Sequence, residues 1–320
     1  MIDRAGREID YIRISVTDRC NLRCCYCMPE EGTSLISHQE ILTFEEIEMI
    51  VRCGVTIGIK KVKLTGGEPL VRKNLPYLAG RIRSLQGIED VTITTNGCLL
   101  GEQAGALKDA GIFGVNVSLD TLDKKRFAEI TRRDSFDLVM DGIERAMACG
   151  LNVKLNCAVM ESLTREDVLA FAAFSEEKGI PVRFIEMMPI GQGCGFNALD
   201  NEELLDILKS RYPDIRKSAQ KRGHGPAGYY EFGERGCVGF ISAVHHKFCD
   251  RCNRVRLTSD GFLKLCLASE EGVNLRDQIR AGMDEKGLTE LMERTIAGKP
   301  LSHHFEEAGV KALNMNQIGG

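Results

Sequence analysis

The sequence lacks the features of membrane proteins, of secreted proteins and of proteins that bind polyanions through bulk charge. No window approaches the roughly 18 unbroken apolar residues of a membrane-spanning helix, and the N-terminus leads directly into charged residues without the apolar segment of a secretion signal. The formal net charge is only −4, so nothing indicates a nucleic acid as partner. Low-complexity tracts and short repeats are also absent. We expect a globular protein of the cytoplasm, with neither a membrane nor a nucleic acid among its partners.

Cysteine, in contrast, is plentiful, and its distribution indicates metal binding. The chain has 13 cysteines, an odd number in a chain far longer than disulfide-stapled proteins. Cys20, Cys24 and Cys27, the first cysteine trio, form a C-x3-C-x2-C motif with an unexplained Cys25 inside the spacing. A cubane cluster held by three cysteines keeps one iron open to a small molecule. A closed zinc site needs four ligands, usually as two C-x2-C pairs, and apart from Cys25 no Cys or His lies near this trio, so the spacing favours an iron–sulfur cluster.

A second cysteine trio lies nearer the C-terminus. Cys249, Cys252 and Cys266 form C-x2-C-x13-C, again without an obvious fourth cysteine. Zinc is a serious alternative here, because many zinc ribbons begin with C-x2-C and a hairpin, and His245 or His246 can supply the missing ligand. The spacing alone leaves the choice between zinc and a second cluster open. Two three-cysteine groups in one chain favour two open clusters.

Segments rich in β-branched residues alternate regularly with helical patterns. Helices are expected between the strands, the first of them capped by Thr43 and Glu46. Such alternation predicts parallel βαβ units, but a complete barrel requires eight strands and about 250 residues. We therefore predict an α/β fold, an incomplete parallel (β/α)6 barrel whose site lies on the loops that follow the strands. The six strands are expected at residues 11–16, 61–65, 91–95, 115–119, 152–156 and 182–186.

The character of the sequence changes after residue 222. A Gly-His-Gly-Pro segment at 223–226 interrupts the helical pattern, and short strands with turns follow it. This predicts two domains, a partial barrel over residues 1–222 and a smaller, partly antiparallel region over residues 223–320. The second cysteine trio belongs to the smaller region.

Basic residues on the predicted strands indicate an anionic ligand. Arg254 and Arg256 alternate with apolar residues directly after Cys252, so their guanidiniums share one face of a strand. Beside a metal centre they form a phosphate clamp, although an exposed edge strand explains them equally well in isolation. Arg13 and Lys63 alternate in the same way on the first two strands, where buried cations need a partner such as a polyphosphate.

The chain ends in Gly319 and Gly320. A frayed terminus is the ordinary expectation. A narrow tail of glycines can also enter a cavity and approach a ligand closely. The residues alone leave both interpretations open.

The motifs in which these residues stand resemble a known family. C-x3-C-x2-C after a strand, followed by Gly66-Gly67-Glu68-Pro69, is similar to the radical S-adenosylmethionine superfamily. Longer segments resemble the GTP 3′,8-cyclase family of molybdenum cofactor biosynthesis, and this resemblance extends from about residue 6 to the C-terminus. The segments are residues 13–21 (RISVTDRCN), 64–70 (LTGGEPL), 183–186 (RFIE), 252–261 (CNRVRLTSDG) and the final two glycines.

The resemblance implies an enzyme with two [4Fe–4S] clusters and S-adenosylmethionine. In that family a 5′-deoxyadenosyl radical abstracts the 3′ hydrogen of GTP, which is converted to (8S)-3′,8-cyclo-7,8-dihydroguanosine 5′-triphosphate in the first step of molybdopterin cofactor biosynthesis. Besides GTP, the implied partners are an external one-electron reductant and a cyclic pyranopterin monophosphate synthase that receives the product. The enzyme is expected as a monomer or a homodimer.

The resemblance also assigns residues. It gives Cys20, Cys24 and Cys27 to the first cluster and Cys249, Cys252 and Cys266 to the second. The positions that match S-adenosylmethionine contacts are Tyr26, Gly67, Ser118 and Met188. The positions that match GTP contacts, with the triphosphate on the cationic ones, are Arg13, Lys63, Thr94, Lys154, Arg183, Arg254 and Arg256. The catalytic positions are Arg254, Arg256, Gly319 and Gly320. Lys63 stands where some relatives carry arginine, and a lysine offers a point charge in place of a bidentate fork.

Two other functions remain open. One is a radical S-adenosylmethionine peptide maturase with an auxiliary cluster. Such enzymes usually carry a peptide-recognition extension before the barrel, whereas about ten residues precede the first predicted strand here. The other is a non-catalytic zinc-ribbon interaction protein.

Overall fold

A twelve-stranded open sheet organises the computed structural model, which describes residues 1–197, 200–303, 305 and 314–319. The strands are β1 (Tyr11–Ser15), β2 (Lys61–Thr65), β3 (Asp90–Thr95), β4 (Gly114–Ser118), β5 (Asn152–Val159), β6 (Val182–Glu186), β7 (Arg216–Lys217), β8 (Gly228–Phe232), β9 (Gly236–Ile241), β10 (Arg254–Leu257), β11 (Phe262–Lys264) and β12 (Gly272–Asn274). The α-helices are α1 (Phe44–Thr56), α2 (Leu75–Arg83), α3 (Leu100–Asp109), α4 (Lys124–Thr131), α5 (Phe136–Ala148), α6 (Arg165–Lys178), α7 (Asn201–Arg211), α8 (Leu275–Arg280), α9 (Glu285–Ala297) and α10 (Met315–Ile318). Short 3-10 helices are η1 (Pro69–Val71), η2 (Gly191–Gly195) and η3 (Cys249–Arg251).

The six strands predicted from the sequence form the middle of the sheet. β1 to β6 lie side by side in chain order, and each neighbouring pair is parallel. Only β5 departs clearly from its expected bounds, because it continues to Val159. The sheet continues at both edges of this set, in the order β12-β11-β10-β1-β2-β3-β4-β5-β6-β9-β8-β7, and does not close. The predicted α/β fold with an incomplete (β/α)6 barrel is confirmed.

The C-terminal region extends both edges of this sheet. β10 pairs in parallel with β1, and β9 pairs in parallel with β6. Beyond them, β11 and β12 on one edge and β8 and β7 on the other are antiparallel. The predicted antiparallel part is therefore present, but it shares one sheet with the barrel strands. The domain boundary at residue 222 stays a prediction.

The helices begin where the sequence carries capping signals. The hydroxyl of Thr43 accepts the N–H of Glu46 at 3.2 Å, and the Glu46 carboxylate accepts the N–H of Thr43 at 2.7 Å, which is the predicted capping box of α1. Thr164 and Asp167 form a second capping box at the start of α6. Among the described helices, none is long and apolar enough to cross a membrane.

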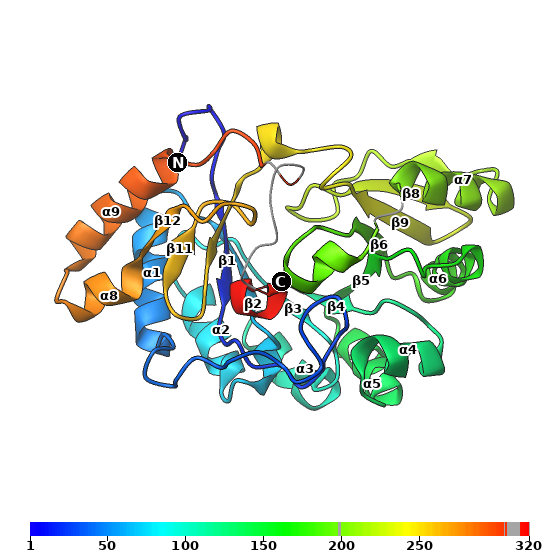
Figure 1. The fold of residues 1–320 in the computed structure, drawn as a ribbon, viewed down its shortest axis with the longest axis horizontal. Coiled ribbons are helices and arrows are strands. Elements are labelled where there is room, and N and C mark those ends of the chain that lie inside the picture. Colours follow the sequence, from blue (N-terminus) through cyan, green and yellow to red (C-terminus); the bar gives the residue numbers. More distant parts are fainter. Residues whose placement is uncertain (198–199, 304, 306–313, 320) are drawn as a thin grey trace.

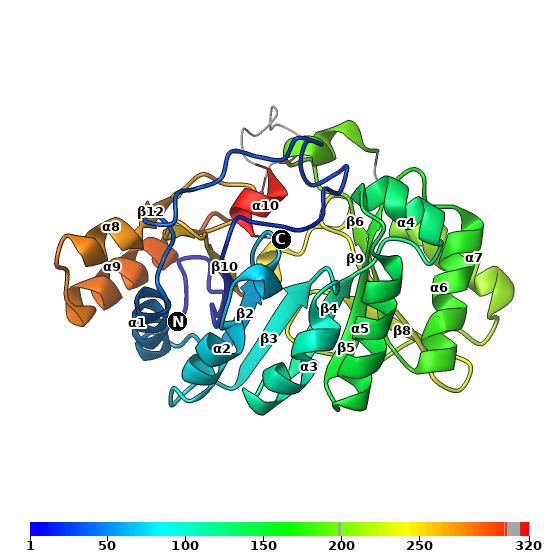
Figure 2. The same ribbon diagram turned by 90° about the horizontal axis from the view of Figure 1, so that it is seen from below.

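Most helices cover one face of the sheet and leave the other face to the site. Figure 2 shows α1, α2, α3 and α5 along one side of the strands and α10 on the opposite side. In Figure 1, α10 lies near the centre of the molecule, close to β2. Ile12, Ile14 and Leu64 belong to the main apolar core. Arg13 and Lys63, which alternate with such residues, line a cavity on the other face.

Candidate active site

The first cysteine trio follows β1 on a loop that is held against the loop after β2. The N–H of Gly67 donates to the carbonyl of Thr17 at 2.7 Å, and the N–H of Glu68 donates to the carbonyl of Arg19 at 2.7 Å. A Cβ on Gly67 would lie 2.4 Å from the carbonyl oxygen of Arg19, far inside contact distance. The two loops approach this closely because position 67 is glycine, and the contact fixes the backbone just before Cys20.

On its other side, the cysteine loop is fastened to the C-terminal end of α4. The N–H of Arg23 donates to the carbonyl of Thr131 at 3.0 Å, and the N–H of Cys25 donates to the carbonyl of Ile130 at 2.9 Å. Cys25, which the sequence did not explain, therefore contributes a backbone contact that holds the loop in place.

Burial and neighbouring negative charge favour the protonated form of the first trio. Burial raises the pKa of Cys20 to about 11 and that of Cys27 to about 12. The pKa of Cys24 lies well above its usual value because of burial, followed by the charges of Cys27 and Asp120. Since the metal ligand is the thiolate, iron binding has to displace these protons. A cationic metal centre would offset the burial of these thiolates and the neighbouring charge of Asp120.

The second cysteine trio is assembled from two segments. Cys249 begins η3 and Cys252 follows it, whereas Cys266 comes just after β11. Burial alone would raise the pKa of Cys252, but the charges of Arg254 and Lys299 bring it below its usual value. Cys252 therefore lies beside cations, whereas Cys24 lies beside the carboxyl group of Asp120.

The geometry of both trios disfavours the zinc alternative. In a tetrahedral site with Zn–S bonds of about 2.3 Å, the sulfur atoms lie about 3.8 Å apart. Within the described ranges, neither trio brings its three Sγ atoms within 4.8 Å of one another. His245 and His246, the candidate fourth ligands, pair with the carboxylates of Glu186 and Glu202 instead. Among the described residues, neither trio is therefore set at the spacing of a zinc site.

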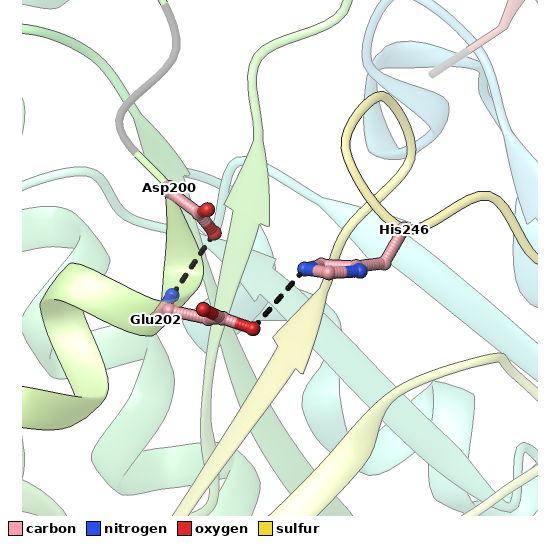
Figure 3. Close-up of side chains that lie close together, drawn as sticks. All are labelled: Asp200, Glu202 and His246. Carbon is pink, nitrogen blue, oxygen red and sulfur yellow. Dashed lines mark hydrogen bonds and ion pairs between the residues drawn. The ribbon is translucent and has the colours of Figure 1, made fainter.

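Asp200, Glu202 and His246 are the one group of described side chains with the spacing of metal ligands (Figure 3). Their contacts account for them without a metal. Asp200 is the N-cap of α7, and its Oδ1 accepts the N–H of Glu202 at 3.0 Å. His246 Nε2 lies 3.4 Å from a carboxylate oxygen of Glu202 in an exposed ion pair. We therefore assign no metal to this group.

One cavity of about 260 Å³ borders both cysteine loops. Gly67, which is predicted to contact S-adenosylmethionine, lies in the contact between the loops after β1 and β2 and does not line this cavity. The Tyr26 hydroxyl donates to Asp120 Oδ2 at 2.7 Å, and burial raises the pKa of Asp120 to about 6. A ligand in this cavity can contact both loops. The lining includes three predicted S-adenosylmethionine positions and the whole second trio, namely Tyr26, Ser118, Met188, Cys249, Cys252 and Cys266.

A second cavity of about 110 Å³ adjoins the first and is strongly basic. Arg256 lines only the larger cavity, which shares Arg13, Thr94 and Arg254 with the basic one. No Asp or Glu is among the described residues that line the basic cavity. Six of the predicted GTP positions line it, namely Arg13, Lys63, Thr94, Lys154, Arg183 and Arg254.

Three cations stand in a row across neighbouring strands. Arg13 on β1 is in register with Arg256 on β10 and with Lys63 on β2. Like charges directly opposite one another destabilise a sheet. Burial, followed by the charges of Arg13 and Arg183, holds the pKa of Lys63 well below its usual value. Nε and Nη2 of Arg183 are buried without a hydrogen-bond partner. A multiply charged anion would satisfy all of these groups at once.

The C-terminal helix α10 connects this region to the first cysteine loop. Asn316 Nδ2 donates to the carbonyl of Asp18 at 3.1 Å and to the Thr33 hydroxyl at 2.8 Å. Gly319 has a φ of 85°, and its carbonyl accepts a hydrogen bond from Arg256 Nη1 at 2.6 Å. The tail thus lies against one of the predicted catalytic arginines. Gly320, the other predicted tail residue, lies outside the described residues.

The structure adds residues to the site that no sequence pattern singled out. Arg222 lines the basic cavity from the loop before β8. Lys299, from the segment after α9, lies within electrostatic range of Cys252 and Cys266. Neither residue belongs to a motif or to an alternating strand, so only their spatial proximity reveals them. Asp120 does carry a signal, because it comes shortly after β4 on the face where a parallel sheet places its site.

Comparison with known proteins gives the class first. The family model described as Radical SAM superfamily matches residues 14–175, and the model described as Molybdenum Cofactor Synthesis C matches residues 180–305. Streptococcus suis SuiB bound to its precursor peptide SuiA shares the fold, with a TM-score of 0.66 and 15% identity over 98% of this chain and 71% of SuiB. In SuiB bound to S-adenosylmethionine the match has a TM-score of 0.64 and 16% identity over 85% of this chain and 64% of SuiB. Fold and site define a radical S-adenosylmethionine enzyme, a class that uses a [4Fe–4S] cluster and S-adenosylmethionine.

Sequence relatives then give the family. A GTP 3′,8-cyclase from Pelotomaculum thermopropionicum is 45% identical over 325 residues, and one from Petrotoga mobilis is 44% identical over 326 residues. Each match covers 100% of both chains. The chain belongs to the GTP 3′,8-cyclase family and is a radical S-adenosylmethionine enzyme of molybdenum cofactor synthesis. The resemblance inferred from the motifs is confirmed.

Proposed function

We propose that the chain converts GTP to (8S)-3′,8-cyclo-7,8-dihydroguanosine 5′-triphosphate and carries a second [4Fe–4S] cluster on its second cysteine trio. The row of Arg256, Arg13 and Lys63 is the observation that supports this most directly, because cations in register on neighbouring strands repel one another and a bound polyanion would offset that repulsion. A nucleoside triphosphate meets this need when its phosphates lie in the basic cavity and its base lies in the larger one, beside the second trio.

Each group of residues then has a role in holding the reactants. Tyr26, Gly67, Ser118 and Met188 hold S-adenosylmethionine, which supplies the radical chemistry when bound at the first cluster. Lys63, Lys154 and Arg183, together with Arg13, bind the triphosphate, and Thr94 lies between the two cavities beside the ribose. Arg254 and Arg256 fix the nucleotide next to the second cluster, and Gly319 and Gly320 complete the site. An enclosed site protects a radical reaction from water and fixes the distance between the reacting atoms.

The proposal includes partners and location. The reaction needs one electron from an external one-electron reductant, and the product passes to a cyclic pyranopterin monophosphate synthase. We place the enzyme in the cytoplasm, where reducing conditions keep thiolates available for iron. It acts as a monomer or a homodimer. The partial barrel over residues 1–222 supplies the first cluster, and the region over residues 223–320 supplies the second.

Nucleotide-dependent cleavage of S-adenosylmethionine tests the proposed function. Protein reconstituted without oxygen and then reduced should form 5′-deoxyadenosine together with a cyclised nucleotide when GTP is present, and neither at a comparable rate with ATP. Iron and labile sulfide should each reach about eight per chain, because each cubane holds about four irons.

Two results would contradict the proposal. Stimulation by ATP or by a peptide, with none by GTP, would exclude the substrate. A fully reconstituted chain with about four irons, or with zinc on the second trio, would exclude the second cluster.

A further inference from the structure

We propose that Arg7 and Lys299 form a cationic brace that positions the three ligands of the second cysteine trio and offsets their negative charge. The inference rests on the proposed second cluster and adds two positioning residues to it. Neither residue belongs to a motif, and they are separated by almost the whole chain. In the rest of this section, the brace means these two side chains.

Arg7 joins three segments through one buried guanidinium. The residue is 7% exposed. Its Nη1 donates to the carbonyl of Cys249 at 2.9 Å, and its two Nη atoms donate to the carbonyls of residues 299–301 at 2.8 to 3.1 Å. Its Nε donates to Asp3 at 2.7 Å, so all of the guanidinium donors have partners. The N-terminal segment, the first ligand of the second trio and the segment after α9 are therefore held together.

Lys299 joins the two remaining ligand segments. Its side chain is buried, and its Nζ donates to the carbonyl of Arg254 at 2.8 Å and to that of Leu265 at 2.5 Å. Arg254 comes two residues after Cys252, and Leu265 comes directly before Cys266. One ammonium group thus spans the gap between the C-x2-C turn and the hairpin that carries the third cysteine.

The two cations act together because Arg7 also holds the backbone of Lys299. The brace therefore reaches the segments of all three ligands. In addition, the Lys299 ammonium lies within electrostatic range of the thiols of Cys252 and Cys266. Hydrogen bonds and charges around cysteine ligands orient them and set the potential of a cluster. A buried cation at this point stabilises the loaded, negatively charged site and raises the reduction potential of the second cluster.

Lys299→Met tests the brace because it removes the ammonium and keeps the length of the side chain. Lys108→Met is the matched control, since the Lys108 ammonium donates to the carbonyl of Gly150 at 2.7 Å on the outer helices, away from both trios. Lys299→Arg restores a positive charge. Each full-length chain is reconstituted without oxygen. Its iron content is determined by a colorimetric assay, and the potential of the second cluster is measured by redox titration followed by electron paramagnetic resonance, with and without GTP.

We expect about eight irons per chain in the unaltered protein and in Lys108→Met. The iron content of Lys299→Met should fall to about four per chain. If the variant keeps its iron, the reduction potential of its second cluster should be lower than in the unaltered protein. Lys299→Arg should recover at least part of the loss. Arg7→Met should show the same loss as Lys299→Met, because the carbonyl of Cys249 then has no cation to hold it. Cleavage of S-adenosylmethionine in the absence of GTP reports on the first site and should stay unchanged in all variants.

Full iron content with an unchanged potential in both Lys299→Met and Arg7→Met would overturn the brace. Loss of iron from both clusters would also overturn it, because the two residues would then support the fold in general and not the second trio in particular. A different result, only about four irons in the unaltered protein, would instead remove the second cluster of the proposed function. The two failures are therefore distinguishable.

Discussion

The loops of the two cysteine trios border the same cavity, the first through Tyr26 and the second through its cysteines, but they differ in the buried charged groups beside them. Near the first trio lie the buried carboxyl groups of Asp120 and Glu68, and burial raises their pKa values to about 6 and about 7. Near the second lie the cations Arg7, Arg254 and Lys299. The two cysteine trios are thus similar in spacing, but the charged groups beside them favour ligands of different charge.

This difference has a physical consequence for what each trio can bind if both carry the proposed clusters. Buried carboxyl groups gain from a neighbouring cation, and S-adenosylmethionine brings a sulfonium and an ammonium to the first site. Buried cations gain from a neighbouring anion, and a nucleoside triphosphate brings several negative charges to the second. Under the proposed function, these charges would separate the two ligands of opposite charge within one cavity.

The largest effect is expected when one cysteine ligand is removed from each trio in turn, which tests whether the two trios have different roles. Cys24→Ala should reduce cleavage of S-adenosylmethionine to background, because the first cluster is its site. Cys252→Ala should retain cleavage in the absence of GTP but abolish the cyclised product. Each variant should lose about half of the iron. Liquid chromatography measures 5′-deoxyadenosine and the cyclised product, and a separate assay measures the iron content. Equal loss of S-adenosylmethionine cleavage in the two variants would mean that the trios do not have separate roles.

Arg256→Ala tests the basic side of the cavity. Loss of a buried charged contact should raise the KM for GTP by roughly tenfold to a hundredfold and leave both clusters loaded. Arg256→Lys keeps the positive charge without the planar guanidinium, so its KM for GTP should lie between those of the unaltered protein and Arg256→Ala. Steady-state kinetics and iron content give the result. An unchanged KM in Arg256→Ala would remove this arginine from the residues that bind the nucleotide.

Gly319→Ala tests the tail that lies between the two regions. A Cβ at position 319 would lie 2.7 Å from the Ser15 Cβ, at a φ that side chains rarely adopt. The strain is about 1–2 kcal/mol, so displacement of the tail should lower product formation about tenfold with both clusters intact. Gly282→Ala is the control, because Gly282 has a φ of 94° but open space around it. Equal activity of both variants would show that the tail has no part in the reaction.

The smallest expected effect is the pH dependence that the titration of Lys154 gives to stability and to the KM for GTP. Burial, followed by the charges of Arg183 and Arg222, lowers the pKa of Lys154 to about 8 from its usual 10.5. Between these values the unfolded chain binds more protons than the folded one, so the free energy of unfolding should rise with pH across this window. A bound triphosphate restores the proton, and the KM for GTP should therefore be flat below pH 8 and rise above it.

Kinetics between pH 6.5 and 9.5 measure this profile. Lys154→Arg should flatten the rise, because a guanidinium stays charged throughout the range. If the KM for GTP of Lys154→Arg rises above pH 8 as it does in the unaltered protein, the rise belongs to a titrating group other than Lys154.

Much of the fold follows from short-range patterns in the sequence. The alternation of β-branched strands with helical segments predicts β1 to β6, because side-chain periods of 2 and 3.6 residues are local properties. The capping box at Thr43 is equally local. The cysteine spacings and the glycine at position 67 likewise carry their chemical meaning without any knowledge of the rest of the chain.

The choice between zinc and a cluster at the second trio required more than spacing. In the structure His245 and His246, the candidate fourth zinc ligands, pair with carboxylates from β6 and α7, which supports the proposed second cluster. The row of Arg256, Arg13 and Lys63 also arises only when three strands far apart in the sequence pair in one register.

The sequence by itself determined the parallel α/β core, the two groups of cysteines and the family, because these depend on residues close together in the chain. Only the tertiary structure decided that the C-terminal strands extend both edges of one sheet, that the first cysteine loop and the second trio border one cavity and that Arg7 meets Lys299 beside the second trio. The reason is physical: the strength of a hydrogen bond or a charge interaction depends on distance in space. Folding sets that distance independently of separation along the chain.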